Sequence, residues 1–363
     1  MAWSPQQEAA LAAVSAWVRR GEPQVFRLFG YAGTGKTTLA RQLAEDIDGD
    51  VCFAAFTGKA ALVLRGKGCP EARTIHSTIY RLRESDTDEP TFVLNHDSPA
   101  AHAALIIIDE CSMVDEELGR DLLSFGKPVL VLGDPAQLPP VKGGGFFTEA
   151  EPDIMLTEVH RQAADNPIIR LSMLAREGER VPLGSYEESR VIRRAEIDAG
   201  LVQAADQVLV GMNRTRRGYT ARLRELAGRT GPYPEADEKL VCLRNDKKKG
   251  LLNGGLWTVK TVAAERSGKL RYGLVPEDEP TRRPLRVAIR PEYFTVGEEG
   301  VPPAFRRNSD AFDFGYVLTV HKAQGSQWDD LVLFDESGAF RDHRHRWLYT
   351  GITRAAKRLT LVV

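Results

Sequence analysis

The sequence lacks a surplus of charge of either sign. Its 363 residues hold 49 lysines and arginines against 50 aspartates and glutamates, which gives a formal net charge of −1. A chain whose whole surface attracts nucleic acid is therefore excluded, and any such surface must be a local patch. Hydrophobic residues make up 42% and charged residues 27%, as in soluble globular proteins, and the length suffices for two or more domains.

Cysteines are also scarce. The four that occur, Cys52, Cys69, Cys111 and Cys242, form no C-x-x-C pair. This spacing excludes a disulfide framework and a zinc site, and it indicates a reducing compartment. No charged segment followed by an apolar one opens the sequence, and no apolar run approaches the ~20 residues that span a bilayer. We therefore expect a cytoplasmic protein with no membrane partner.

What the sequence does contain is a phosphate-loop pattern, G-x-x-x-x-G-K-T, from Gly30 to Thr37. Its glycines let backbone N–H groups close around phosphate oxygens, and the helix expected to follow adds partial positive charge. Lys36 would contact the β- and γ-phosphates of a nucleoside triphosphate, and the Thr37 hydroxyl would bind Mg²⁺. The alternative is a glycine turn without a ligand.

The spacing of apolar runs predicts an α/β fold. Residues 5–20 form an amphipathic helix pattern, with Ser4 as its N-cap and Pro5 as its first residue. Continuous apolar runs then alternate with helical stretches, which favours a parallel sheet covered on both faces. The predicted strands are 25–29, 51–56, 104–108 and 128–132, and the predicted helices are 36–47, 58–65 and 113–124.

A second alternation of strands and helices follows. Its predicted strands are 154–159, 190–193, 207–210, 331–334 and 359–363, and its predicted helices are 214–227 and 342–353. Two stretches interrupt the pattern. Residues 239–296 are rich in β-branched residues and turns, which predicts a small antiparallel β insertion, and 81–103 is a shorter polar excursion.

An acidic pair, Asp109-Glu110, ends the apolar run at 104–108. Carboxylates at the carboxyl end of a buried strand, downstream of a phosphate loop, lie where a nucleotide hydrolase needs them. Asp109 would hold Mg²⁺ directly or through its waters, and Glu110 would orient and deprotonate the attacking water. The alternative is a solvated pair of loop carboxylates.

Other polar residues follow later strands. Gln137, after the run at 128–132, could sense a γ-phosphate or water, although the stretch could equally be a plain turn. Arg161 and Arg354 could place positive charge on a γ-phosphate, but a single arginine is usually solvated or ion-paired. Small hydroxyls, histidines and lysines at strand ends suit contacts with nucleic-acid phosphates; such groups occur at 57–59, 73–77 and 319–326.

Together these motifs resemble those of superfamily 1 DNA helicases of the 5′→3′ branch, the RecD-like and Dda-like group. The resemblance covers nearly the whole chain, in the order of the family's motifs. The matching segments are Ser4–Gln7 (Q motif), Gly30–Thr38 (I), Phe56–Leu64 (Ia), Arg73–Ser77 (Ib), Ile107–Asp115 (II), Gly133–Pro140 (III), His160–Gln162 (IV), Val317–Gln327 (V) and Tyr349–Arg354 (VI).

The resemblance implies an architecture of two RecA-like P-loop NTPase domains with ATP between them. The first would span 1–155 and contain a short pin insertion at 81–103. The second would span 156–238 plus 310–363 and contain an SH3-like β insertion at 239–309.

The resemblance also implies roles for single residues. The catalytic set would be Lys36, Glu110, Gln137, Arg161 and Arg354, with Gln137 as γ-phosphate sensor and both arginines as fingers. Nucleotide contacts would come from Gln7, Gly33, Thr34, Gly35, Lys36, Thr37, Thr38 and Gly325, and Mg²⁺ ligands from Thr37 and Asp109. Contacts to the DNA strand would come from Thr57, Lys59, Thr74, His76, Thr319 and His321.

The function implied is an ATP-dependent 5′→3′ helicase or translocase on single-stranded DNA, a monomeric motor that also engages tailed duplex. Its protein partners would belong to DNA repair, recombination or replication. Two alternatives stay open: an ATP-switched single-strand clamp or recombination-complex subunit with little unwinding, and a small-molecule P-loop kinase, for which motifs Ib and V would have no purpose.

Overall fold

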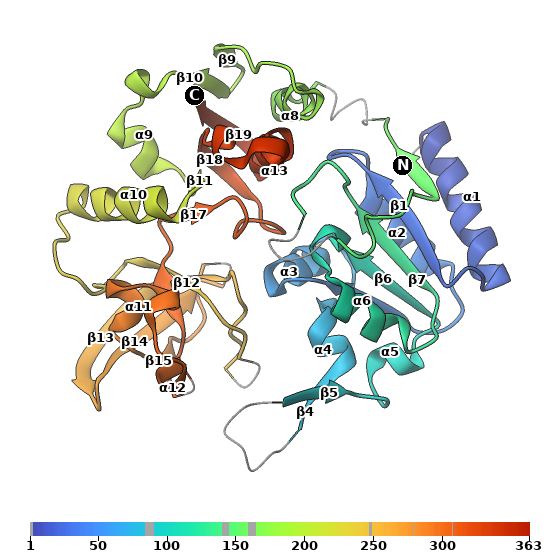
Figure 1. Ribbon diagram of the computed structural model, residues 1–363, viewed down its shortest axis with the longest axis horizontal. Coiled ribbons are helices and arrows are strands. Elements are labelled where there is room, and N and C mark those ends of the chain that lie inside the picture. Colours follow the sequence, from blue (N-terminus) through green and yellow to red (C-terminus); the bar gives the residue numbers. More distant parts are fainter. Residues whose placement is uncertain are drawn as a thin grey trace. The chain divides into compact units, whose positions relative to one another are not determined.

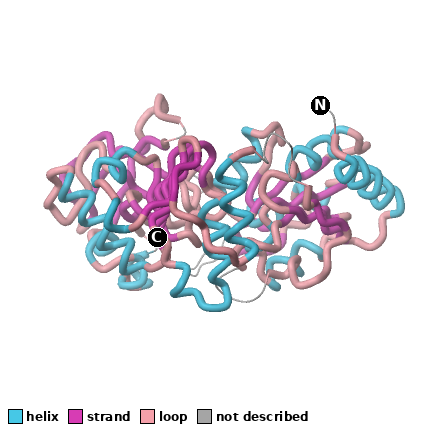
Figure 2. The backbone as a smooth tube through the Cα atoms, turned by 90° about the horizontal axis from the view of Figure 1, so that it is seen from above, coloured by secondary structure: helices cyan, strands magenta, loops and turns pink. Residues whose placement is uncertain are grey.

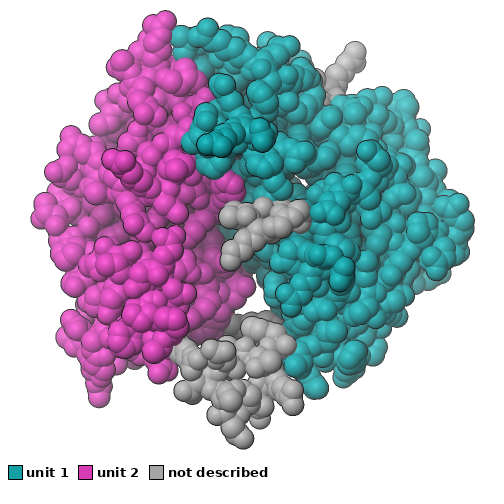
Figure 3. All heavy atoms as spheres, viewed as in Figure 1, with its two compact units in different colours: residues 1–191, 324–329, 337–360 teal, residues 192–323, 330–336, 361–363 magenta. Residues whose placement is uncertain are grey.

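The structure, a computed structural model, describes residues 3–83, 91–139, 145–158, 165–246, 249–277, 279–306 and 308–363. Contacts along the chain divide it into two compact units (Figure 3). The first holds residues 1–191, 324–329 and 337–360, and the second holds 192–323, 330–336 and 361–363. Both mix helices and strands, joined by loops (Figure 2). None of the described helices is long and apolar enough to cross a membrane.

The first unit is built on a parallel sheet with the strand order β3-β2-β6-β7-β1-β8. Its strands are β1 (Val25–Gly30), β2 (Val51–Ala55), β3 (Arg73–Thr74), β6 (Leu105–Asp109), β7 (Val129–Gly133) and β8 (Ile154–Leu156). The four strands predicted at 25–29, 51–56, 104–108 and 128–132 are confirmed, each end within one residue. Continuous apolar runs therefore identified these strands correctly.

Helices cover both faces of this sheet (Figure 1). Successive strand residues point to opposite faces, so Ile107 packs with α1, α2 and α3, while Ile106 and Ile108 pack with α4, α5 and α6. The helices of the first unit are α1 (Pro5–Arg20), α2 (Lys36–Glu45), α3 (Gly58–Gly66), α4 (Ile75–Ile79), α5 (Pro99–His102), α6 (Glu116–Leu123), α8 (Pro167–Glu177) and α13 (Arg344–Ile352).

Helix α1 begins as predicted, at Pro5 after the N-cap Ser4. The Ser4 hydroxyl accepts a hydrogen bond from the N–H of Gln7, and the Gln7 side chain accepts one from the N–H of Ser4, which completes a capping box. Helix α6 begins at Glu116, later than predicted, because the Asp115 side chain caps it by accepting from Leu118. A 3₁₀ turn, Cys111–Met113, lies before that cap.

The first unit also contains two antiparallel strand pairs. In the excursion at 81–103, β4 (Tyr80–Arg83) pairs with β5 (Thr91–Leu94), and residues 84–90 between them lie outside the described residues. Further on, β9 (Gly184–Tyr186) pairs with β10 (Ser189–Ile192). The remaining elements are a 3₁₀ segment at Ser337–His343 and β19 (Ala355–Val362).

The second unit combines parallel and antiparallel pairing. Strand β11 (Gln207–Val210) lies between β17 (Val317–Thr319) and β18 (Trp328–Phe334), parallel to both. The antiparallel sheet predicted at 239–296 is present, in the order β15-β14-β13-β12-β16, and extends to Phe314. Its strands are β12 (Lys239–Cys242), β13 (Leu256–Arg266), β14 (Lys269–Pro276), β15 (Leu285–Ile289) and β16 (Phe312–Phe314). The helices of this unit are α9 (Ala199–Ala204), α10 (Asn213–Leu226), α11 (Glu292–Thr295) and α12 (Pro303–Arg306), with 3₁₀ turns at Arg194–Glu196 and Glu298–Gly300.

A buried ion pair joins α10 to the residue before β12. The carboxylate of Glu238, which is 0% exposed, accepts hydrogen bonds from Nε and Nη2 of Arg224 at 2.7 and 3.0 Å. It also accepts from the N–H of Glu235 and the hydroxyl of Tyr316. The guanidinium of Arg224 stacks on Phe314 of β16. This pair therefore links the helix to both the loop and the sheet of the second unit.

We expect Glu238→Ala to destabilise the protein by about 3–5 kcal/mol, because it leaves the buried Arg224 charge without its partner. Urea unfolding followed by circular dichroism measures this loss. The control is Glu299→Ala, which removes one partner of the exposed Arg217–Glu299 pair at 3.7 Å, and there we expect a change below about 1 kcal/mol. Equal losses in the two variants would contradict the structural role of Glu238.

Candidate nucleotide site

The phosphate loop joins β1 to α2 at the carboxyl edge of the first sheet. Gly33 and Gly35 have φ of 80° and 82°, left-handed values that glycine adopts without strain. Helix α2 begins at Lys36, so its first unpaired N–H groups lie next to this turn. The ammonium of Lys36 donates to the carbonyls of Gly30 and Tyr31 at 2.6 and 3.0 Å. The loop therefore has the shape and charge of an anion-binding cradle.

Asp109 ends β6, and its carboxylate lies beside α2. Its Oδ2 accepts a hydrogen bond from the Thr37 hydroxyl at 3.1 Å, and its Oδ1 accepts from the N–H of Glu110 at 2.9 Å. The predicted metal pair, Thr37 and Asp109, is thus in direct contact. In the described part of the chain, no group of three or more histidine, cysteine or acidic side chains could hold a metal. One carboxylate and one hydroxyl fit Mg²⁺, which keeps several waters and binds substrate phosphates.

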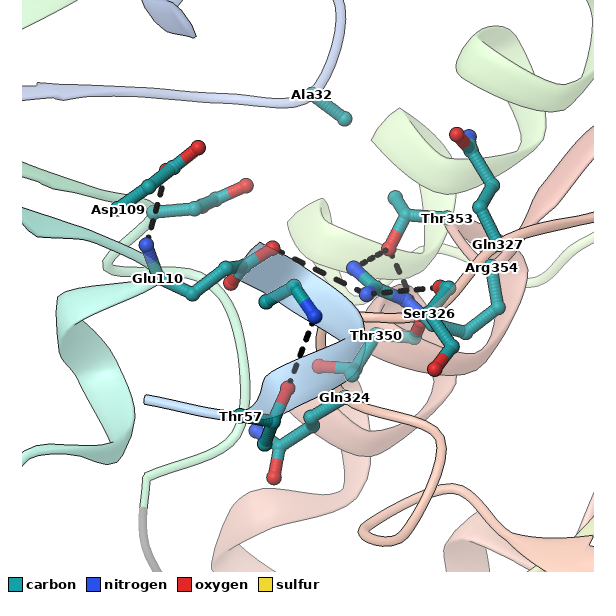
Figure 4. Close-up of polar contacts among 12 residues, drawn as sticks. Ala32, Thr57, Asp109, Glu110, Gln324, Ser326, Gln327, Thr350, Thr353 and Arg354 are labelled. Atoms are coloured by element: carbon teal, nitrogen blue, oxygen red, sulfur yellow. Dashed lines mark hydrogen bonds and ion pairs between the residues drawn. The ribbon is translucent and has the colours of Figure 1, made fainter. Parts of the chain in front are cut away.

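Glu110 lies one residue further, in a left-handed backbone conformation with φ 55° that is uncommon for glutamate. Its side chain points toward Arg354 (Figure 4), whose Nη1 lies 3.9 Å from Oε1. Burial raises the pKa of Glu110, and Asp109 adds to the increase, while the charges of Arg354 and Lys36 oppose it. A carboxylate with a raised pKa, held near a cation, is suited to accept a proton.

Arg354 follows α13 and is itself buried. Its guanidinium donates to the carbonyl of Thr350 at 3.1 Å, to the carbonyl of Ser326 at 3.3 Å and to the Thr353 hydroxyl at 3.3 Å (Figure 4). These three hydrogen bonds fix the orientation of its planar donor group.

Gln137 lies in the loop after β7 and is only 7% exposed. Within the described residues, its Oε1 is a buried acceptor that has no hydrogen-bond partner. An unsatisfied buried acceptor costs about 1–3 kcal/mol, so such an atom calls for a partner from a ligand or water.

One cavity of about 340 Å³ brings most of the predicted catalytic and nucleotide residues together. It is lined by Gly33, Gly35, Lys36, Thr37, Thr38, Asp109, Glu110, Gln137, Gly325 and Arg354. The sequence reasoning missed other lining residues, among them Asp134, Ser326 and Thr353, which lie next to the predicted ones in motifs III, V and VI. All of these residues belong to the first compact unit.

Two predicted nucleotide residues do not line the cavity. The Thr34 side chain is buried and its hydroxyl donates to the carbonyl of Tyr31. Gln7 is 2% exposed, and its amide donates to the carbonyl of Thr34 at 3.0 Å while it accepts from Ser4 at 3.1 Å. Gln7 therefore ties α1 to the phosphate loop, and its contact with adenine stays a prediction.

The predicted DNA contacts lie at helix starts and turns. The hydroxyls of Thr57 and Thr74 cap α3 and α4, and Lys59 and His76 lie in the first turns of those helices. In the second unit, Thr319 ends β17, and its hydroxyl accepts a hydrogen bond from the backbone N–H of Lys322. His321 follows in the turn. The threonines thus have local hydrogen-bonding roles that a DNA contact would have to share. Arg161 lies outside the described residues.

The match to known families follows this arrangement. Residues 2–196, more than half of the chain, match the family described as an AAA domain. Residues 314–362 match the UvrD-like helicase C-terminal domain. The two matches together contain every motif segment from which the resemblance was drawn.

Individual relatives agree with these matches. The chain is 31% identical to the ATP-dependent RecD2 DNA helicase of Deinococcus radiodurans, over 91% of this chain and 46% of that protein. It is 34% identical to the ATP-dependent DNA helicase dda of Enterobacteria phage T4, over 41% of this chain and 37% of that protein. The chain thus spans about half, or less, of the length of these curated relatives.

Solved structures show the same fold. A Bacteroides Pif1 helicase in complex with ADP-AlF3 and ssDNA superimposes with a TM-score of 0.58 at 17% identity, over 99% of this chain and 92% of that chain. Pif1 helicase from Candida albicans gives a TM-score of 0.54. The mixed α/β fold with its parallel sheet is thus of the RecA-like helicase type. The chain belongs to the AAA-domain family that these matches define, and its resemblance to superfamily 1 helicases of the 5′→3′ branch is confirmed.

Proposed function

We propose that the chain is an ATP-driven motor that moves 5′→3′ along single-stranded DNA and separates tailed duplexes. One observation carries this proposal: a single cavity is lined by residues that lie far apart in sequence. These residues are Lys36, Asp109, Glu110, Gln137 and Arg354. Nucleotide hydrolysis needs a phosphate-binding loop, ligands for Mg²⁺, a general base, a polar group that contacts the γ-phosphate and a fixed positive charge. The cavity offers each of these groups.

When bound, Mg²⁺-ATP supplies the phosphoanhydride bond whose hydrolysis drives the motor. Lys36 neutralises the β- and γ-phosphates, while the N–H groups around Gly33, Thr34, Gly35 and Thr38 hold phosphate oxygens. Thr37 and Asp109 would hold Mg²⁺, and Gly325 and Gln7 would add further nucleotide contacts.

The residues that act on the water and the leaving phosphate come from other strands. Glu110 takes the proton of the attacking water, and the positive charge of Arg354, 3.9 Å away, opposes the rise in its pKa that burial causes. Gln137 offers its unpartnered Oε1 to that water or to the γ-phosphate. Arg354, joined by Arg161, stabilises the charge that develops on the transferred phosphoryl group.

The motor would hold a single DNA strand through contacts with its phosphates. We propose that Thr57, Lys59, Thr74 and His76 contact it from the first RecA-like domain (1–155), and Thr319 and His321 from the second (156–238 plus 310–363). The β4–β5 pair in 81–103 is the proposed pin, and the antiparallel sheet within 239–309 is the proposed SH3-like insertion.

The cellular setting is inferred from the relatives and the thiols. One relative is the RecBCD enzyme subunit RecD of Mycolicibacterium smegmatis, 25% identical over 92% of this chain and 67% of that protein. We propose that this chain works as a monomeric motor with protein partners of DNA repair, recombination or replication. All four cysteines are free, which suits the cytoplasm.

Lys36→Ala should lower ATP hydrolysis at least about a hundredfold, because the phosphates lose their positive charge at the transition state. Binding of a labelled single strand, measured by fluorescence anisotropy, should persist, because Lys36 is not among the proposed strand contacts. Steady-state ATPase with and without single-stranded DNA measures the loss. A normal rate in this variant would mean that the phosphate loop is not the site of hydrolysis.

Arg354→Ala should lower the turnover number for ATP at least about a hundredfold, as expected for a finger that acts on the transition state. The matched control is Arg346→Ala. Arg346 lies on α13, the helix that leads to Arg354, but is exposed and does not line the cavity, so its removal should leave turnover within about twofold. Similar losses in both variants would argue against a specific role for Arg354.

Tailed duplexes test the direction of movement. With ATP, we expect strand displacement from a duplex with a 5′ single-stranded tail and none from blunt or 3′-tailed duplexes of the same sequence. Gel separation of labelled strands over time measures this. Displacement from the 3′ tail alone would reverse the polarity, and DNA-stimulated ATPase with no displacement from any substrate would favour the clamp.

A further inference from the structure

The loop that carries Gln137 is held on both sides of that residue. On one side, the carboxylate of Asp134 accepts a hydrogen bond from the hydroxyl of Tyr349 at 2.5 Å. On the other side, the N–H of Leu138 donates to the Thr350 hydroxyl at 2.9 Å, and its carbonyl accepts from the Gln324 amide at 2.9 Å. Tyr349 and Thr350 are neighbours on α13. This helix therefore fixes the loop at both of its ends.

The same tyrosine also contacts the phosphate loop. Its hydroxyl accepts a hydrogen bond from the N–H of Ala32 at 2.9 Å while it donates to Asp134. Both of its hydrogen-bonding functions are thus used within the chain, and the side chain is 1% exposed. A single oxygen atom therefore connects the phosphate loop, the Gln137 loop and α13.

Helix α13 leads directly into Arg354. The carbonyl of Thr350, whose hydroxyl holds Leu138, accepts from Nε of Arg354 at 3.1 Å. A displacement of α13 would consequently move the guanidinium and the Gln137 loop together. Through the hydrogen bond between the Tyr349 hydroxyl and Ala32, the phosphate loop would move with them.

We propose that Tyr349 is a positioning residue whose hydroxyl sets the Gln137 loop in register with the phosphate loop and Arg354. This inference rests on the proposed function, because it assigns the group that aligns the sensor within the same site. Tyr349 does not line the cavity, so its effect on hydrolysis would pass through Asp134 and Gln137.

The chemistry around Asp134 explains why the hydroxyl matters more than the ring. Asp134 is 3% exposed, and burial raises its pKa. The charges of Lys36 and Arg354 and the hydrogen bonds from Tyr349 and the N–H of Ala136 oppose that increase. Without the hydroxyl, the buried carboxylate of Asp134 keeps the N–H of Ala136 as a donor but loses that of Tyr349, and the N–H of Ala32 loses its acceptor. Both loops would then relax toward other partners.

The test is Tyr349→Phe, which keeps the ring and removes only the oxygen. We expect the turnover number for ATP to fall roughly tenfold to a hundredfold, the effect of losing a hydrogen bond to a charged group, and the KM for ATP to change less than about threefold. The control is Tyr316→Phe. The Tyr316 hydroxyl likewise donates to a carboxylate, that of Glu238, and accepts from an N–H, that of the Arg229 guanidinium, but neither partner belongs to the phosphate loop, the Gln137 loop or α13.

A double-mutant cycle with Gln137→Ala separates positioning from general destabilisation. If Tyr349 acts through Gln137, the double variant Tyr349→Phe/Gln137→Ala should be no slower than the slower single variant within about threefold. Multiplicative losses, or a Tyr349→Phe enzyme as fast as Tyr316→Phe, would overturn the proposal.

Amide hydrogen exchange tests the connection independently of catalysis. In Tyr349→Phe, exchange should rise at least about threefold in peptides covering 30–36 and 133–139, and it should stay unchanged there in Tyr316→Phe. Unchanged exchange in both peptides would refute the positioning role even if the protein hydrolyses ATP. If exchange rises in Tyr349→Phe but the wild-type protein shows no ATPase, the structural link would stand and the proposed function would be rejected.

Discussion

The site depends on one constraint, the adjacency of parallel strands that end at the same edge of a sheet. Strands β6, β7 and β1 lie side by side in the first unit and run in one direction. Each ends in a polar segment: Asp109-Glu110 after β6, Asp134 and Gln137 after β7, and the phosphate loop after β1. Neighbouring parallel strands are about 4.8 Å apart, so groups that are distant in sequence become neighbours without any long-range loop.

This constraint explains which features were predictable. Asp109 and Glu110 follow a continuous apolar run, and the phosphate loop follows a run broken only by Arg27. A buried parallel strand reads as such a run. Local signals also sufficed for α1, whose cap Ser4 and first residue Pro5 are adjacent in sequence. The antiparallel sheet that contains β12 was indicated by its β-branched residues and turns, one of which is Asn253-Gly254-Gly255, where Gly254 has a φ of 82°.

Pairings between distant segments were not predictable in the same way. The hydrogen bond between Tyr349 and Asp134 joins residues that are 215 positions apart, and although both lie in motif segments, no local pattern indicates that they pair. The motif predicts a contact of Gln7 with adenine, but it does not predict that the buried amide also bonds Ser4 and Thr34. Its role as a link depends on how α1 packs on the sheet, and this packing is a tertiary property that periodicity alone does not specify.

Electrostatics at the cavity follows from the same crowding of strand ends. Glu110, Asp109 and Asp134 gather at this edge, and burial raises the pKa of both Glu110 and Asp134. The opposing charges are Lys36 from the phosphate loop and Arg354 from the end of α13. Three acids face two fixed cations, so a divalent cation beside Asp109 would reduce the repulsion among the carboxylates.

A phosphate group would in turn compete with Glu110 for Arg354, whose guanidinium lies 3.9 Å from the Glu110 carboxylate. Release of Glu110 from that pair would leave a half-buried carboxylate with a raised proton affinity, which is the property that a base needs when water attacks.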